Sequence, residues 1–208
     1  MQFVWTVKKS PYDEIRYSIR SVLKFHPDAK IFVIGDLPEW YCGSGVEVTR
    51  RGTANEDRTR KINIALGMFD EFVRMDDDMF LLEPFKMAHY YHGYFKERIK
   101  LCKGKTERQR IFMNTYELFP DEYDYNQHTP LAIYSHTIKE VPQNIAFKQW
   151  YCSIETRYPK VEQKDVKIRS RKESIPDAPF FSTQDNVKYL LDELEKMYPD
   201  VSHCENDR

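Results

Sequence analysis

Three consecutive carboxylates, Asp76, Asp77 and Asp78, lie between two mostly apolar stretches at 72–75 and 79–82. Adjacent anions repel one another and lose hydration when they are buried, so this arrangement needs a compensating cation. Mg²⁺ and Mn²⁺ prefer oxygen ligands and commonly combine one or two carboxylates with the phosphates of a substrate. The pattern therefore predicts a site for a divalent ion and a nucleotide diphosphate. The alternative is a strand that ends in a solvated acidic turn.

The three aspartates can have different roles in binding the metal ion and the nucleotide. We expect Asp78 to be the most direct metal contact, with Asp76 or Asp77 assisting. If the strand continues through them, their side chains alternate in direction, so one carboxylate can hold the ribose or the sugar while the others hold the metal. Asp76 is thus a candidate for binding both metal and donor, and Asp77 is a candidate for a direct role in catalysis.

Four cations near helix beginnings are candidates for binding phosphate. Lys8 and Arg16 flank the start of the first expected helix, and Arg58 and Lys61 stand three residues apart near the start of a later one. Helix N-termini and cations both favour bound phosphate. A solvated helix surface is the alternative for Arg16, Arg58 and Lys61.

Three residues of the second half complete the candidate site. His128 precedes an apolar run and is a candidate for a third metal ligand or a general base. Asp165 is an alternative base for an acceptor hydroxyl, and Lys167 is placed to balance the charge of a departing phosphate. A structural histidine and a strand-surface lysine are the corresponding alternatives.

Strand and helix patterns alternate in the first half of the chain. Ser10 is expected to cap the first helix, with Pro11 as its first helical residue. Ligands of such sheets bind at the carboxyl ends of strands, which is where the three aspartates stand. The predicted elements are strands at 2–7, 30–35, 46–48 and 71–76, and helices from Ser10 and over 56–69.

The second half is less regular. Residues 84–127 show no clean period and predict short helices and loops, with aromatic and basic side chains that suit stacking and phosphate contacts or an ordinary helix surface. Further helices are expected at 135–141 and 145–157, and a strand at 165–168. Ser182 and Asp185 are expected to cap a last helix.

Composition excludes several classes of protein. The 208 residues are 41% hydrophobic with a formal net charge of −1, which argues against disorder and gives no overall sign of nucleic-acid binding. No glycine-rich dinucleotide or P-loop motif is present. The apolar runs are shorter than the roughly 18–20 residues that span a bilayer. We therefore expect a soluble cytoplasmic protein, in the host cytoplasm if phage-encoded, with reduced cysteines.

Several segments resemble known transferases. Residues 12–21 and 31–40 resemble the early segments of Stealth-type sugar-phosphate transferases, and residues 72–80 resemble their acidic strand end. The chain is more similar to compact phage and prophage glycosyltransferases with a GT-A fold, some of which are associated with hypermodified DNA bases. That similarity is carried by His128-Thr129-Pro130, Asp165-Val166-Lys167 and Pro179-Phe180-Phe181-Ser182-Thr183-Gln184-Asp185.

The second resemblance implies an α/β, GT-A-like fold: a Rossmann-type central mixed sheet flanked by helices, with a more irregular helical C-terminal half. It implies one domain over 1–208, in which 1–83 bind the nucleotide-sugar and 84–200 supply acceptor and catalytic groups. The implied reaction is transfer of a sugar, dependent on Mg²⁺ or Mn²⁺, from a UDP-sugar donor to a hydroxyl. A 5-hydroxymethylpyrimidine in phage DNA is the implied acceptor.

Two alternatives remain. One is a Stealth-like sugar-phosphate transferase acting on a polysaccharide, although residues 4–9 read Val-Trp-Thr-Val-Lys-Lys where Stealth proteins have an acidic first motif. The other is a non-catalytic module that binds nucleotides or nucleic acid.

Overall fold

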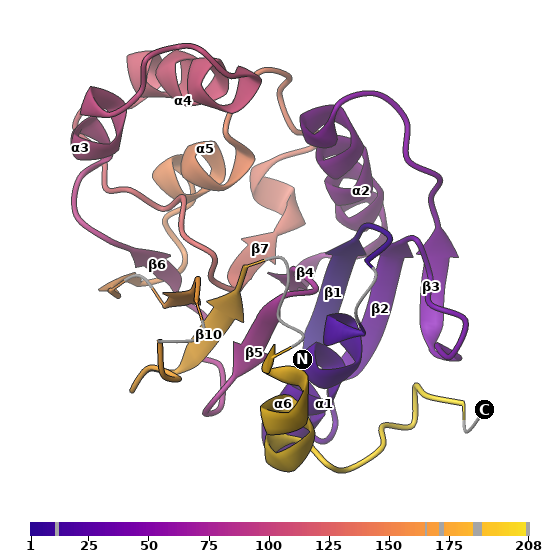
Figure 1. Cartoon of the computed structure of the whole chain (residues 1–208). Helices are drawn as coiled ribbons and strands as arrows, with labels where there is room; N and C mark the ends of the chain where they lie inside the picture. The colour runs from indigo at the N-terminus through magenta and orange to yellow at the C-terminus, as the bar shows by residue number, and fades with distance from the viewer. Residues whose placement is uncertain (11–12, 165, 171–172, 185–188, 207–208) are drawn as a thin grey trace.

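A five-stranded mixed sheet forms the centre of the protein (Figure 1). The computed structural model describes residues 1–10, 13–164, 166–170, 173–184 and 189–206. The strand order is β3-β2-β1-β4-β7; the first four strands are parallel, and β7 runs antiparallel to β4. The strands are β1 (Gln2–Val7), β2 (Lys30–Gly35), β3 (Ser44–Glu47), β4 (Glu71–Met75) and β7 (Leu131–Tyr134).

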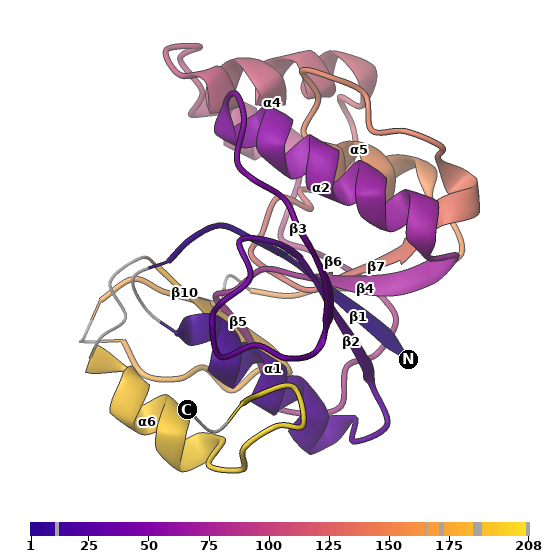
Figure 2. The same ribbon diagram turned by 90° about the vertical axis from the view of Figure 1, so that its right-hand side faces the viewer.

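Helices cover both faces of this sheet, as Figure 2 shows. Phe3 and Trp5 of β1 pack in one apolar cluster with α1 (Glu14–Phe25), whereas Val4 packs in a second cluster with α2 (Ala54–Met68). Successive side chains of a strand point to opposite faces, so β1 contributes to both cores. All three side chains are fully buried, and burial of such a side chain stabilises the fold by about 2 kcal/mol.

The first two helices differ from the sequence prediction at their beginnings. α1 begins at Glu14 with Asp13 at the N-cap position, so Ser10 is not the cap, and Pro11 lies outside the described residues. α2 begins at Ala54 because Thr53 and Glu56 form a capping box, in which each side chain binds the backbone N–H of the other residue. Each helix buries an apolar face, with Ile15, Ile19 and Val22 in α1 and Ile62, Ala65 and Leu66 in α2.

A smaller sheet adjoins the acidic segment. β10 (Phe180–Thr183) lies between β5 (Met79–Leu81) and β9 (Lys167–Ile168). Ser182 pairs with Met79 inside this sheet, so its predicted role as a helix cap is wrong. Asp185, the other predicted cap, lies outside the described residues, as does Asp165 at the start of the strand predicted over 165–168.

The remaining elements build the second half. The prediction of a helix over 135–141 is wrong, because a single 3₁₀ turn, η1 (Ser135–Thr137), lies there. The helix predicted over 145–157 is the shorter α5 (Phe147–Ile154). No helix within the described part of the chain is long and apolar enough to cross a membrane. The other elements are β6 (His89–Tyr91), α3 (Phe95–Lys100), α4 (Glu107–Leu118), α5 (Phe147–Ile154), β8 (Lys160–Glu162) and α6 (Leu191–Met197).

Candidate active site

The three aspartates form a turn at the carboxyl end of β4. β4 ends at Met75 and β5 begins at Met79, and the Met79 N–H donates to the Asp76 carbonyl at 3.3 Å. The expectation that Asp76, Asp77 and Asp78 alternate along a continuing strand is therefore wrong. The Asp78 carbonyl accepts a hydrogen bond from the Thr183 N–H at 3.0 Å, so β10 helps to hold the turn in place.

Helix α1 contacts the strand that directly follows this turn. The Ser18 hydroxyl accepts a hydrogen bond from the Trp5 indole at 2.9 Å and donates to the Met79 carbonyl. One helical turn away, the Ser21 hydroxyl accepts a hydrogen bond from the Leu81 N–H at 3.1 Å. Two buried serines thus satisfy backbone groups of the short strand β5, which fixes where the acidic turn leaves the core.

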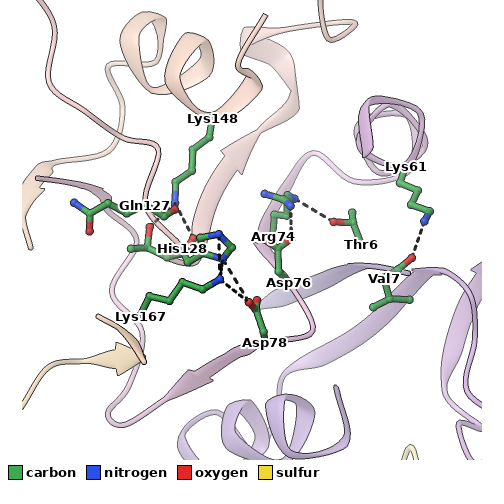
Figure 3. Close-up of polar contacts among 11 residues, drawn as sticks. Thr6, Val7, Lys61, Arg74, Asp76, Asp78, Gln127, His128, Lys148 and Lys167 are labelled. Atoms are coloured by element: carbon green, nitrogen blue, oxygen red, sulfur yellow. Dashed lines mark hydrogen bonds and ion pairs between the residues drawn. The ribbon is translucent and has the colours of Figure 1, made fainter. Parts of the chain in front are cut away.

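Asp76, Asp78 and His128 come together as a candidate metal centre (Figure 3). One ligand atom from each residue lies within 4.8 Å of the others, and His128 Nδ1 is 3.5 Å from Asp78 Oδ2. Asp78 Oδ1 is buried without a hydrogen-bond partner among the described residues, so it has a lone pair to offer a cation. Two carboxylates and one imidazole suit a divalent ion such as Mn²⁺. The donor set therefore fits the predicted metal.

Lys167 lies at the same corner. Its Nζ is 3.5 Å from Asp78 Oδ2 and 3.4 Å from His128 Nδ1, and Figure 3 shows the three side chains pointing toward one another. The ammonium group is close enough to offset part of the charge of Asp78. The sequence separates these three residues widely. The small sheet formed by β5, β9 and β10 brings Lys167 of β9 close to Asp78, which precedes β5, and His128 comes from the segment before β7.

A buried arginine makes two of the aspartates electrostatically different. Arg74 of β4 is 6% exposed, pairs with Asp76 and donates through Nε to Thr6 Oγ1 at 3.2 Å. Burial opposes the ionisation of Asp76, but the positive charges around it, of which Arg74 contributes most, together outweigh burial and lower the pKa of Asp76 to about 2. Burial, followed by the charges of Asp78 and Asp76, raises the pKa of Asp77 to about 7. Asp76 is therefore ionised at neutral pH, while Asp77 is held near its midpoint.

The acidic turn opens into a cavity of about 810 Å³. Such a volume lies within the range of ligand-binding pockets in proteins. The wall is rich in positive charge although the whole chain carries a formal net charge of −1. Its acidic side chains are Asp57, Asp76, Asp77, Asp78 and Glu107, and its basic side chains are Lys8, Arg50, Arg58, Lys61, Arg74, Arg98, Arg108, Lys148, Lys167 and Arg169.

The predicted phosphate-binding cations have different surroundings. Lys8 and Arg58 line the cavity. Lys61 also lines it, but its Nζ donates to the Val7 carbonyl at 2.6 Å and pairs with Asp57 at 2.6 Å, so it ties α2 to the end of β1. Its contacts therefore give it a structural role besides any role in binding.

Arg16 is not brought together with the other predicted site residues. Its guanidinium lies over the Trp40 ring at 4.7 Å from the centroid, and its Nε is 3.5 Å from Glu205 Oε2. Arg16 is not among the residues that line the cavity. Asp165, the predicted alternative base, lies outside the described residues.

Lys148 is a site residue that the sequence analysis missed. Its Nζ donates to the carbonyl of Gln127 at 3.0 Å (Figure 3) and to that of Thr129 at 2.8 Å, and these two residues flank His128. Burial lowers the pKa of Lys148 to about 8. This lysine fixes the backbone that presents His128 to the cavity. The sequence signal for Lys148 is a single lysine among the aromatic residues of α5. Arg74 has a similar signal, as a single cation among apolar residues of β4.

The fold is similar to that of LgtC. The structure of an active-site mutant of LgtC matches with a TM-score of 0.54 at 10% identity, covering 98% of each chain. A structure of the galactosyltransferase LgtC in complex with donor and acceptor sugar analogs matches with a TM-score of 0.40 at 12% identity, over 99% of this chain and 67% of that chain. The apo-form glycosyltransferase GlyE of Streptococcus pneumoniae TIGR4 gives a TM-score of 0.34 at 12% identity, over 59% and 44%.

The first of these likenesses confirms the predicted fold class, a GT-A-like α/β architecture with a central mixed sheet. No protein-family model matches the sequence, and no curated protein matches it significantly. The structural similarity therefore establishes the fold alone. The residues of the site carry the argument for a reaction.

Proposed function

We propose that this protein transfers a sugar from a nucleotide-sugar donor to an acceptor hydroxyl with the help of bound Mn²⁺ or Mg²⁺. The observation that carries the proposal is the cluster of Asp76, Asp78 and His128, which stands at the carboxyl end of β4 in a large cationic cavity. Carboxylates for a divalent ion, beside cations for phosphate, are the groups that a nucleoside diphosphate requires. A UDP-sugar is the donor we propose.

The residues of the cavity have distinct tasks in this proposal. Asp76, Asp78 and His128 hold the ion, which when bound supplies positive charge for the nucleoside diphosphate as it leaves. Lys167, beside Asp78 and His128, and Lys8, on the cavity wall, bind phosphate oxygens. Arg74 keeps Asp76 ionised and therefore ready to bind the ion.

In the transfer step one bond forms, one bond breaks and one proton is transferred. The acceptor oxygen forms a bond to the anomeric carbon, the bond from that carbon to the diphosphate oxygen breaks, and the acceptor hydroxyl loses its proton to a base. Asp77 lines the cavity beside both metal-binding aspartates and is the base we propose, with Asp165 as the second candidate from the sequence.

The acceptor we propose is a hydroxymethylated pyrimidine in DNA. The support is the resemblance of the sequence to phage and prophage glycosyltransferases and the many arginines and lysines on the cavity wall. Incubation with radiolabelled UDP-sugars, Mn²⁺ and hydroxymethyl-base DNA should label the DNA and release UDP. Release of UMP would instead indicate transfer of a phosphosugar, and absence of labelling with every common donor sugar would count against this acceptor.

The metal centre can be tested without knowledge of the acceptor. A ligand that binds only the native state raises its stability, so UDP with Mn²⁺ should raise the melting temperature of the wild-type protein. Asp78→Asn should remove most of this rise while the protein stays folded, because relief of clustered negative charge need not destabilise it. Asp121→Asn, a change at an exposed carboxylate outside the cavity, is the matched control. An unchanged rise in Asp78→Asn would overturn the proposed metal centre.

A further inference from the structure

Three helices bring arginines to one part of the cavity wall. Arg58 comes from α2, Arg98 from α3 and Arg108 from α4, and all three line the cavity. In the fold α2 and α4 lie in the same layer, above the sheet as Figure 2 is drawn. Three arginines from separate helices therefore line the same cavity as the acidic turn.

The positive charge of these arginines is only partly balanced. Arg98 Nε pairs with Asp124 at 2.6 Å. No ion pair joins Arg58 or Arg108 to a carboxylate within the described ranges of the chain. The charge of Arg58 acts on Asp76 and lowers its pKa, which also balances part of the positive charge. Because like charges repel, three guanidinium groups of which only Arg98 pairs with a carboxylate in the described part of the chain favour the binding of an anion.

Phe112 of α4 keeps two of the arginines together. The Arg98 and Arg108 guanidinium carbons lie 5.6 Å and 5.4 Å from the centroid of its ring. Arg108 is exposed overall, but partial desolvation of its guanidinium group, followed by the positive charges of Arg58 and Arg98, lowers its pKa. The cations are therefore held near enough to repel one another, and a bound anion would relieve that repulsion.

We propose that Arg58, Arg98 and Arg108 bind a phosphate group of the acceptor. This proposal rests on the proposed function, because it assumes that the donor diphosphate is held at the metal centre. That diphosphate already has the ion, Lys8 and Lys167 as partners. Two of the three arginines stand on α3 and α4, in the half of the chain that we assign to the acceptor.

Guanidinium groups suit this ligand chemically. Arginine presents parallel N–H donors that match two phosphate oxygens at once, and its charge persists at every physiological pH. Sugar phosphates and the phosphodiesters of nucleic acid share this chemistry. A cavity of about 810 Å³ falls at the upper part of the range for small-molecule sites, which suits a donor and part of an acceptor together.

The experiment uses inorganic phosphate as the probe, titrated by calorimetry into the full chain saturated with UDP and Mn²⁺. We expect wild-type protein to bind phosphate under these conditions and Arg108→Gln to bind it about tenfold more weakly, as the loss of a charge-assisted hydrogen bond predicts. Arg110→Gln is the matched control, because Arg110 stands on the same helix but does not line this cavity. UDP binding should be equal in all three proteins.

Two results would overturn the acceptor site. One is phosphate binding in Arg108→Gln that equals the wild type. The other is loss of phosphate binding when UDP and Mn²⁺ are added, or weaker UDP binding in Arg108→Gln, since the arginines would then serve the donor. If UDP does not bind at all, the proposed function fails, and the phosphate titration alone then decides whether the arginines form an anion site.

Titration with a hexose phosphate and with a short oligodeoxynucleotide identifies the source of the phosphate. Binding of either probe that weakens in Arg108→Gln but not in Arg110→Gln supports the site. The probe with the greater loss of affinity marks the class of acceptor, and equal behaviour of both variants toward both probes would contradict the proposal.

Discussion

Asp76, Asp77 and Asp78 are adjacent in sequence, yet the fold gives each carboxylate a different environment. Asp76 pairs with buried Arg74, Asp78 faces His128 and Lys167, and burial near two other anions raises the pKa of Asp77 to about 7. A triple aspartate in solution has no such differences. The environment of each carboxylate, more than its residue type, therefore decides what it can bind.

Lys148 provides a prediction at this scale, as a residue that positions His128. Lys148→Met removes the hydrogen bonds to the carbonyls of Gln127 and Thr129 and should loosen the segment that carries His128. Loss of groups that orient a ligand commonly lowers metal affinity by 10- to 100-fold, so we expect a drop of about tenfold in Mn²⁺ affinity.

Electron paramagnetic resonance of free Mn²⁺ measures that affinity directly. Lys139→Met, at an exposed lysine, is the control for loss of a positive charge. The melting temperature of each apo variant separates a positioning role from general destabilisation. Wild-type Mn²⁺ affinity in Lys148→Met would show that the lysine does not position His128.

At the scale of elements, the last described segment of the chain is fastened to α1. Arg20 Nε and Nη2 each donate to Glu205 at 2.9 Å, and Nη1 donates to the Tyr198 carbonyl at 3.1 Å. The side chains of Arg20 and Glu205 are 5% and 2% exposed. This bidentate pair holds the segment after α6 against the helix that supports the acidic turn.

Glu205→Gln should therefore destabilise the protein. Breaking a buried ion pair by removing one partner leaves an uncompensated charge, and we expect a loss of about 3 kcal/mol of unfolding free energy at pH 7. Burial opposes ionisation of Glu205, but hydrogen bonds from Arg20 and Ser202 outweigh it and lower the pKa.

The pH dependence of this effect follows from the sign of the pKa shift. Because the folded pKa lies below the unfolded value of 4.5, the stabilisation is complete above pH 4.5 and disappears as the pH falls through the folded pKa. Urea unfolding of wild type and Glu205→Gln should thus differ at pH 7 and converge in acid. A difference that stays constant over this range would contradict the assignment.

The sequence predicts elements best where a local pattern decides the structure. β1 and β2 match their predicted bounds, since continuous apolar runs have few alternatives to a buried strand. The helix predicted over 135–141 fails because its residues follow β7 directly and form a single 3₁₀ turn. Local periodicity cannot show where a neighbouring strand ends.

The candidate site was only partly predictable for a related reason. The acidic turn is a local motif, and Asp76, Asp78 and His128 do come together. Arg16 is predicted from its place near the start of the first helix, but the partner of a side chain depends on the fold, and Arg16 pairs with Glu205, which is distant in sequence. Arg98 and Arg108 face the cavity because of how α3 and α4 pack, which no local pattern records.

At the scale of the whole molecule, both halves of the chain contribute to one cavity. The turn after β4 supplies the aspartates, whereas His128, Lys148 and Lys167 come from the later half, whose strand β7 also completes the central sheet. The predicted division at residue 83 therefore separates two parts of the chain that both line the same cavity.

The hydrogen bond from the Thr183 N–H to the Asp78 carbonyl has a consequence for biosynthesis. Chains begin to fold from the N-terminus while the ribosome still adds residues. A nascent chain that has emerged as far as β7 already contains the three aspartates. It still lacks Lys167 and β10, the strand that is hydrogen-bonded to the acidic turn. Completion of the proposed metal centre therefore requires synthesis of β9 and β10, and a product truncated after β7 would carry the aspartates without Lys167 and without the hydrogen bond from Thr183.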